Sequence, residues 1–158
     1  HGRGLFCANR ALLPEGVALR DLWQWCTTVR EHRGDSHVAA LAVLGINGLE
    51  ATVLLAIEQG IDLEMFEESR GWHHDHMSGT VERLINIGLL ESRDRLSDAG
   101  RGLRSEVEDM TDRQAFAVVS RLAHDYEAVL AVLESAAERI REQQEIPFPN
   151  PMGLDKPS

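Results

Sequence analysis

The run VERLINIGLL at residues 81–90, followed by LSDAGR at 96–101, decides the fold of this chain. Three short helical patterns, with apolar residues three or four apart, precede it at 47–60, 62–71 and 74–87. A glycine stands near the end of each pattern, where helices commonly stop. Residues 89–96 are long enough for two short strands around Arg93 and Asp94, and Ser97 is placed to cap a further helix.

This order of helices, polar hairpin and further helix is typical of MarR-like winged helix-turn-helix domains. We therefore expect a mainly α fold with a small two-stranded wing and long C-terminal helices. The pattern at 111–143 is helical, and residues 111–114 are either a capping box or part of one continuous helix. The expected division is an N-terminal arm at 1–16, a winged-helix domain with C-terminal helices at 17–145, and an extended proline-rich tail at 146–158.

A helix with Leu19, Leu22 and Cys26 on its apolar face follows the arm. Gly34 suits the position that stops this helix, and Asp35 is placed to cap the next one at 37–44. The second of these helices is apolar nearly all round, which predicts a central position.

Composition and charge narrow the function classes. The 158-residue chain has a formal net charge of −10, which disfavours nonspecific binding to nucleic acid or to an anionic membrane. Its two cysteines, Cys7 and Cys26, are too few for a disulfide framework or a zinc site, so we expect free thiols, no cofactor and a cytoplasmic location. No apolar run approaches the roughly 20 residues of a membrane span, and the first residues lack the layout of a signal peptide.

The helix-turn-helix pattern suggests a DNA reader whose charge is unfavourable. Arg83 and Asn86 lie on the expected recognition helix, where they suit guanine and adenine, and Arg93 and Arg95 lie in the wing. Residues 62–95, however, hold eight carboxylates against four arginines. Since phosphate neutralisation supplies much of DNA affinity, fold and charge point to different functions.

The densest polar run is REHRGDSH at 30–37, directly before an apolar stretch. Polar groups beside a core are paired or open onto a cavity. In the cavity interpretation His37, His32 and Asp35 are the candidate catalytic residues, with His37 kept neutral by the N-terminal end of its helix. The candidate ligand-binding residues are Trp23, Arg30, Arg33 and Trp72. Two alternatives stay open: Arg33 pairs with Asp35 around a corner at Gly34, or the run is solvated surface.

The run WHHDH at 72–76 resembles a metal site, but its spacing argues against one. Only His73 and His76 share a helical face, and helical zinc sites use histidines four residues apart. We therefore expect no metal. Trp72 is predicted to cover the turn as a hydrophobic lid, with His74 or Asp75 capping the helix.

Four runs together resemble an uncharacterised actinobacterial winged-helix family: GRGLFCANR at 2–10, REHRGDSHVAAL at 30–41, RGW at 70–72 and IPFPNP at 146–151. The resemblance spans nearly the whole chain, and the run at 30–41 is its most specific part. It implies a fold and a motif but no mechanism. Because the motif lies away from the recognition helix, it favours a ligand pocket or active site. The histidines at 73–76 depart from the family pattern.

The leading hypothesis is a small-molecule-binding winged-helix protein, possible general acid–base catalyst and homodimer, acting in actinobacterial secondary metabolism. The alternative is a MarR-like, ligand-responsive DNA-binding transcription regulator. A third hypothesis is a subunit that completes a partner through apolar surface around Leu5, Phe6 and Phe148. In each case the C-terminal helices, together with Leu19, Trp23 and Cys26, are the expected dimer interface.

Overall fold

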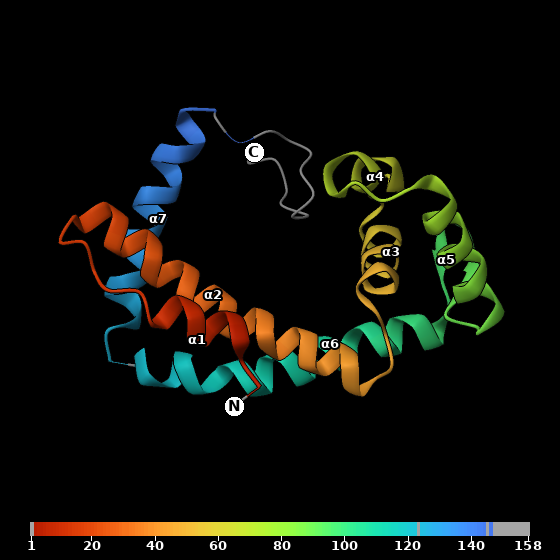
Figure 1. The fold of residues 1–158 in the computed structure, drawn as a ribbon, viewed down its shortest axis with the longest axis horizontal. Helices are drawn as coiled ribbons and strands as arrows, with labels where there is room; N and C mark the ends of the chain where they lie inside the picture. Colours follow the sequence, from red (N-terminus) through yellow and green to blue (C-terminus); the bar gives the residue numbers. More distant parts are fainter. Residues whose placement is uncertain (1, 123, 145, 147–158) are drawn as a thin grey trace. The chain divides into compact units, whose positions relative to one another are not determined.

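The computed structural model describes residues 2–122, 124–144 and 146, and in this part of the chain it is mainly helical, with one small two-stranded antiparallel sheet (Figure 1). The chain divides into two compact units, each of which is described by itself. Unit 1 comprises His1–Gly48 and Gly102–Arg121, and unit 2 comprises Leu49–Arg101 and Leu122–Ser158.

Unit 1 consists of three helices. These are α1 (Gly4–Arg10), α2 (Ala18–Val43) and most of α6 (Asp98–Val119), with a short 3-10 turn, η1 (Ser120–Leu122), at its end. Helix α1 lies beside α2 within the predicted N-terminal arm (Figure 1). The arm therefore contains a packed helix.

Helix α2 corrects the prediction for residues 17–44. The sequence predicts a stop at Gly34 and a new helix capped by Asp35, but α2 continues from Ala18 to Val43 without interruption. A glycine inside a helix costs only about 1 kcal/mol, which contacts with neighbouring helices outweigh. Hydrogen bonds from α2 to both α1 and α6 supply such contacts here.

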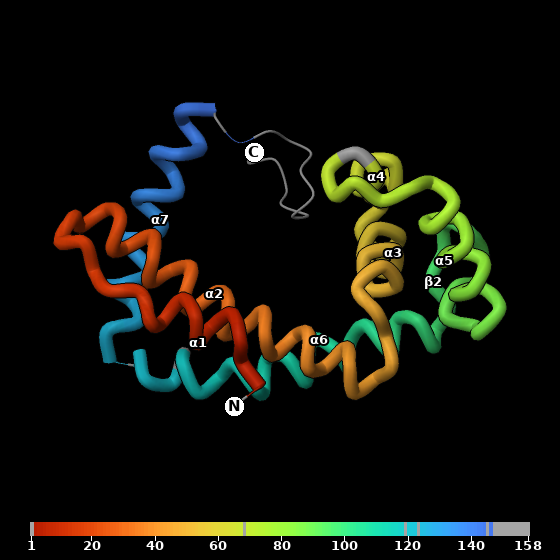
Figure 2. Tube along the Cα trace, viewed as in Figure 1, coloured from red at the N-terminus to blue at the C-terminus, as the bar shows by residue number. Residues whose placement is uncertain are grey.

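Unit 2 contains the helix-turn-helix segment. Helices α3 (Gly48–Gln59), α4 (Leu63–Arg70) and α5 (His74–Asn86) are followed by strands β1 (Leu90–Ser92) and β2 (Arg95–Leu96). The strands pair antiparallel, with Leu90 opposite Leu96, and β1 contacts α5 (Figure 2 labels α5 and β2). The predicted hairpin is confirmed. The buried apolar side chains of unit 2 come from all of these elements: Val53, Leu54, Ala56, Phe66, Met77, Val81, Leu84, Leu90 and Leu96.

Local signals place the ends of these helices as predicted. The Asp62 side chain accepts a hydrogen bond from the Glu64 backbone N–H and caps α4. Gly71 ends α4 in the left-handed conformation, with φ of 66°, which glycine adopts without steric strain. Ser97 Oγ accepts from the Gly100 N–H at 3.0 Å and caps α6. A β-carbon on Gly100 would overlap the Leu89 carbonyl oxygen, so this position requires glycine.

The C-terminal pattern is two helices rather than one. Thr111 lies inside α6, which resolves the two alternatives in favour of a continuous helix there. A break at η1 then separates α6 from α7 (Tyr126–Glu142). Residues 147–158, including most of the predicted tail and Phe148, lie outside the described residues.

Among the described helices, none is by itself long and apolar enough to cross a membrane; only the consecutive helices α2 and α3, taken together, pass that test of length and composition.

Candidate functional site

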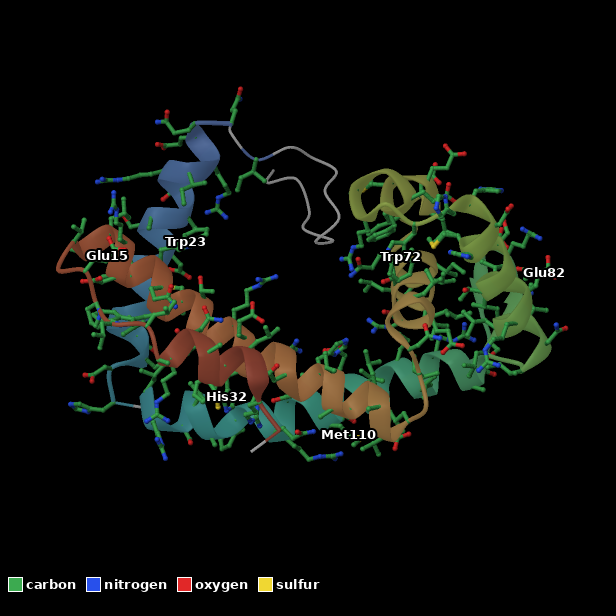
Figure 3. The ribbon with its side chains drawn as sticks, viewed as in Figure 1. Glu15, Trp23, His32, Trp72, Glu82 and Met110 are labelled. Atoms are coloured by element: carbon green, nitrogen blue, oxygen red, sulfur yellow. The ribbon has the colours of Figure 1, made fainter. Side chains whose placement is uncertain are left out.

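Helix α5 exposes one polar face over its whole length. Met77, Val81 and Leu84 are buried against the rest of unit 2, while the opposite side is exposed. Figure 3 shows Glu82 pointing away from α3 on this outer side. The exposed residues of α5 are His74, Asp75, His76, Gly79, Glu82, Arg83 and Asn86. The DNA-binding interpretation names four residues, and all of them belong to unit 2: Arg83, Asn86, Arg93 and Arg95. Each of the three arginines has a carboxylate partner.

Arg83 is held by a buried carboxylate. Its Nε donates to Oε1 of Glu50 on α3 at 2.6 Å. The Glu50 side chain is only 2% exposed, whereas the Arg83 side chain is 60% exposed. The contact therefore joins the outer surface of α5 to the interior of unit 2. This contact was not predictable from the sequence pattern, because the two residues are 33 positions apart.

The two hairpin arginines pair with exposed carboxylates. Arg93 forms an ion pair with Glu82 of α5, which brings the hairpin beside the exposed face of that helix. Arg95 pairs with Glu91 within the hairpin at 2.6 Å. The hydrogen bond from Ser92 lowers the pKa of the Asp94 carboxyl, so Asp94 is ionised at the tip between them. Both arginines of the hairpin are therefore already paired with a carboxylate.

The histidines at the start of α5 form a local hydrogen-bonded group. His74 Nδ1 lies 3.1 Å from Glu67 of α4, and His73 and His76 meet edge to face at 5.8 Å between ring centroids. Within the described residues no group of three or more His, Cys, Asp or Glu side chains has a geometry suited to a metal ion. The N-cap residue is His73, without a side-chain cap, so the prediction that His74 or Asp75 caps α5 is wrong. Trp72 is half-buried in the turn.

The polar run at 30–37 lies on two sides of one continuous helix. On one side, Arg33 Nη2 donates to Glu108 at 2.7 Å and to Asp112 at 3.1 Å, both on α6. On the other side, Asp35 accepts from the Phe6 backbone N–H of α1 at 2.9 Å. The alternative in which Arg33 pairs with Asp35 is therefore wrong. These carboxylates and guanidinium join α1 and α6 to α2.

His37 contacts α6. Its Nδ1 lies 3.3 Å from Thr111 Oγ1, and the Thr111 hydroxyl itself donates to the Val107 carbonyl at 2.7 Å. Since that hydroxyl proton is already used, Thr111 accepts from His37, which assigns the proton of neutral His37 to Nδ1. Burial lowers the pKa of His37, and the helix-dipole explanation is wrong because His37 stands inside α2.

His32 contacts α1, and Arg3 completes the junction. The His32 ring meets the Phe6 ring edge to face at 4.9 Å (Figure 3 labels His32). Arg3 donates to the His32 carbonyl at 2.6 Å, to the Ser36 hydroxyl, and to the Gln114 carbonyl of α6 at 3.1 Å. Burial, followed by the charge of Arg3, lowers the pKa of His32. Sequence reasoning missed Arg3, although it lies in the run at 2–10.

The remaining predicted ligand residues are dispersed. Trp23 is 72% exposed on α2, Arg30 pairs with its neighbour Glu31 at the surface, and Trp72 belongs to unit 2. Within unit 1, His32 and Asp35 face α1 while Arg33 and His37 face α6. The structure thus gives the motif residues partners in helix packing, and their assignment to a ligand or catalytic site stays a prediction.

Comparison with known proteins identifies one relationship. The family model described as a helix-turn-helix family matches residues 1–147. No curated protein and no solved structure matches the chain. The match covers both units, including the polar junction of unit 1 and the exposed face of α5.

Proposed function

Because the chain belongs to this helix-turn-helix family, we propose that it is a DNA-binding transcription regulator of the winged, MarR-like kind. Helix α5 enters the major groove and the hairpin of β1 and β2 acts as the wing. The observation that carries the proposal is the family match, together with an α4–turn–α5 segment whose second helix exposes a continuous polar face.

The exposed residues assign separate roles in recognition. Asn86 suits a bidentate contact with adenine, and Arg83 suits guanine. Arg93 and Arg95 of the hairpin contact phosphates or the adjacent minor groove, where a wing lies. Both kinds of contact are needed, because phosphate contacts orient the protein while base contacts provide sequence preference.

The carboxylates around these arginines make binding selective. For Arg93 or Arg95 to reach a phosphate, its ion pair with Glu82 or Glu91 has to open. Exposed ion pairs contribute only about 0.2–1 kcal/mol, so this exchange is easily reversed by a phosphate in the correct position. The net charge of −10 meanwhile opposes binding to arbitrary DNA. We therefore expect nonspecific binding that is micromolar only at low salt, about 50 mM, and weakens steeply as salt is raised, with a marked preference for one sequence.

The regulator acts as a homodimer, which matches a pair of half-sites about one helical turn apart. Helix α7 supports this assembly because its apolar residues Tyr126, Val129, Leu130 and Ile140 follow one helical face and remain partly exposed. Sedimentation equilibrium tests it: Val129→Glu should give monomers, and Ala131→Glu, on another face of the same helix, should not. Equal dimerisation of both variants would contradict this interface.

The proposed function is tested by selecting bound duplexes from a randomised pool at about 50 mM salt. The wild-type chain should enrich a recurring sequence. Arg93→Gln should weaken binding to it several-fold by removing a phosphate contact. Arg20→Gln, which removes an exposed arginine of α2 that pairs with Glu15, should not. Failure of the wild-type chain to enrich any sequence would contradict a sequence-reading regulator.

A further inference from the structure

Glu50 is a buried carboxylate that binds an exposed arginine. Glu50 lies on α3 among the apolar side chains that form the interior of unit 2, and it is nearly inaccessible to solvent. Burying a carboxylate is costly, and an apolar residue of similar volume often stabilises such a position better. A carboxylate at this position is therefore kept for the hydrogen bonds that it accepts, and the one from Arg83 connects it to the surface.

One of the groups that the Glu50 carboxylate binds is an exposed side chain. Arg83 Nε donates to Glu50 Oε1 at 2.6 Å, so the guanidinium group is fixed at its inner edge. The opposite edge carries Nη1 and Nη2, and the Arg83 side chain as a whole is 60% exposed. A guanidinium is a planar, rigid fork of donors, so fixing Nε also fixes the direction of the Nη edge.

The outer edge suits one acceptor pair in DNA. Guanine presents O6 and N7 side by side in the major groove, and an arginine that donates two parallel hydrogen bonds to them makes the commonest specific contact. Arg83 is on the last turn and a half of α5, three residues before Asn86. The two side chains therefore read neighbouring base pairs when α5 lies in the groove.

We propose that Glu50 is a positioning residue for sequence reading: it holds Arg83 with its Nη edge directed at a guanine. This inference rests on the proposed function and adds to it the residue that determines preference at one base pair. Glu50 does not contact DNA and influences base preference through Arg83.

The hairpin pairs show why this pair is different. The carboxylate partners of Arg93 and Arg95 are 56% and 39% exposed, against 2% for Glu50. An exposed pair reorients freely and exchanges with a phosphate, which has no fixed direction of approach. A buried carboxylate keeps its position when DNA binds, so Arg83 is pre-organised for a base edge rather than released to the backbone.

The test compares base preference in four purified full chains: wild type, Glu50→Gln, Arg83→Lys and the control Glu58→Gln, which removes a carboxylate from the exposed end of α3. Each chain selects duplexes from a randomised pool, and affinities for the selected site and its single-base variants are then measured by fluorescence anisotropy. Thermal unfolding of each chain is recorded alongside, because a structural role would change it without changing base preference.

The wild type and Glu58→Gln should prefer guanine at one position. Glu50→Gln and Arg83→Lys should each lose that preference by about tenfold or more, while preferences at other positions are retained. If both variants unfold at lower temperature but keep the guanine preference, Glu50 is only a structural clamp and the inference is overturned. If the wild type selects no sequence, the proposed function fails, and the inference fails with it.

Discussion

The two units use their polar residues in opposite ways. In unit 1 the motif residues Arg33, Asp35 and His37 all contact another helix, on two different sides of α2. In unit 2 the polar residues of α5 form a continuous exposed face, and the buried partner of that face, Glu50, points outward to Arg83. The run at 30–37 is the more distinctive motif in the sequence. In the structure its side chains are also the more fully paired, because they contact other helices.

The difference between the units shows that a distinctive polar run has one of two roles: it pairs with other helices in the fold, or it is exposed to a partner. Arg3 and Asp35 satisfy backbone groups of other helices, which is a structural requirement of buried polar atoms. An exposed face that stays polar over three turns has no such requirement and is available to a partner. The comparison therefore favours a structural role for the motif of unit 1 and supports our proposal that α5 is the recognition helix.

The largest expected effect comes from Gly100→Ala. The added β-carbon would overlap the Leu89 carbonyl oxygen, so α6 and the hairpin have to separate. We expect unit 2 to lose about 3 kcal/mol of unfolding free energy. Trp72 reports unit 2, so its fluorescence in a Trp23→Phe, Trp25→Phe background should change at lower urea concentration.

The matched control is Gly102→Ala, two residues further along the same helix. No atom lies within 4 Å of a β-carbon there, and alanine favours helix by roughly 0.5–1 kcal/mol over glycine. This variant should be neutral or stabilising. Equal destabilisation by both substitutions would contradict the close contact between α6 and the hairpin.

The second effect is expected in unit 1. Arg3→Ala removes the donors to His32, Ser36 and Gln114, which join three helices. A charged hydrogen-bond network of this kind contributes about 2 kcal/mol, whereas Arg10→Ala at the exposed end of α1 should cost less than about 1 kcal/mol. Urea unfolding followed by Trp23 and Trp25 measures both. Arg3→Ala should leave DNA affinity unchanged. A loss of affinity without a loss of stability would contradict the separate roles proposed for the motif of unit 1 and for α5.

A smaller effect concerns nonspecific binding. Glu82→Gln removes the ion-pair partner of Arg93 and one negative charge from the outer face of α5. Affinity for random-sequence duplex should rise about two- to fivefold, as expected for one exposed pair. Anisotropy at several salt concentrations checks this. Unchanged or weaker binding would show that the carboxylate does not compete with phosphate.

The smallest effect is a pH dependence of unit 1. Burial lowers the pKa of both His32 and His37 below the ordinary 6.5, so the unfolded chain binds protons that the folded chain does not. Stability is therefore full above pH 6.5 and is lost as pH falls through 6.5 toward the lowered folded values. His37→Gln should reduce this loss in thermal unfolding measured from pH 7.5 to 5. A steeper loss in the variant would contradict the assignment.

Sequence reasoning succeeded where the cause of a structure is local. The Asp62 cap, the Gly71 stop and the Ser97 cap each depend on residues at most three positions away, so the pattern determines them. The helix-turn-helix order and the hairpin were predicted from the same short-range signals, and the match to a helix-turn-helix family supports that order, while the MarR-like and actinobacterial details stay predictions.

Sequence reasoning failed where contacts between distant segments determine the structure. Gly34 and Asp35 look like a helix stop and a cap, but Asp35 accepts the backbone N–H of Phe6, 29 residues away, and α2 continues. Likewise the contact between Glu50 and Arg83 joins residues that are 33 positions apart. Nothing in the local pattern states which helix packs against which, so these partners were not predictable.

The measurement that tests the account most directly is binding of the wild-type chain to a random-sequence duplex, by fluorescence anisotropy at about 50 mM salt. Reading of DNA through α5 and the hairpin predicts micromolar or tighter binding, with an affinity that falls steadily as salt is raised. Absence of detectable binding under these permissive conditions would contradict the proposed function. The polar junction of His32, Arg33, Asp35 and His37 would then be the surface to test against small molecules.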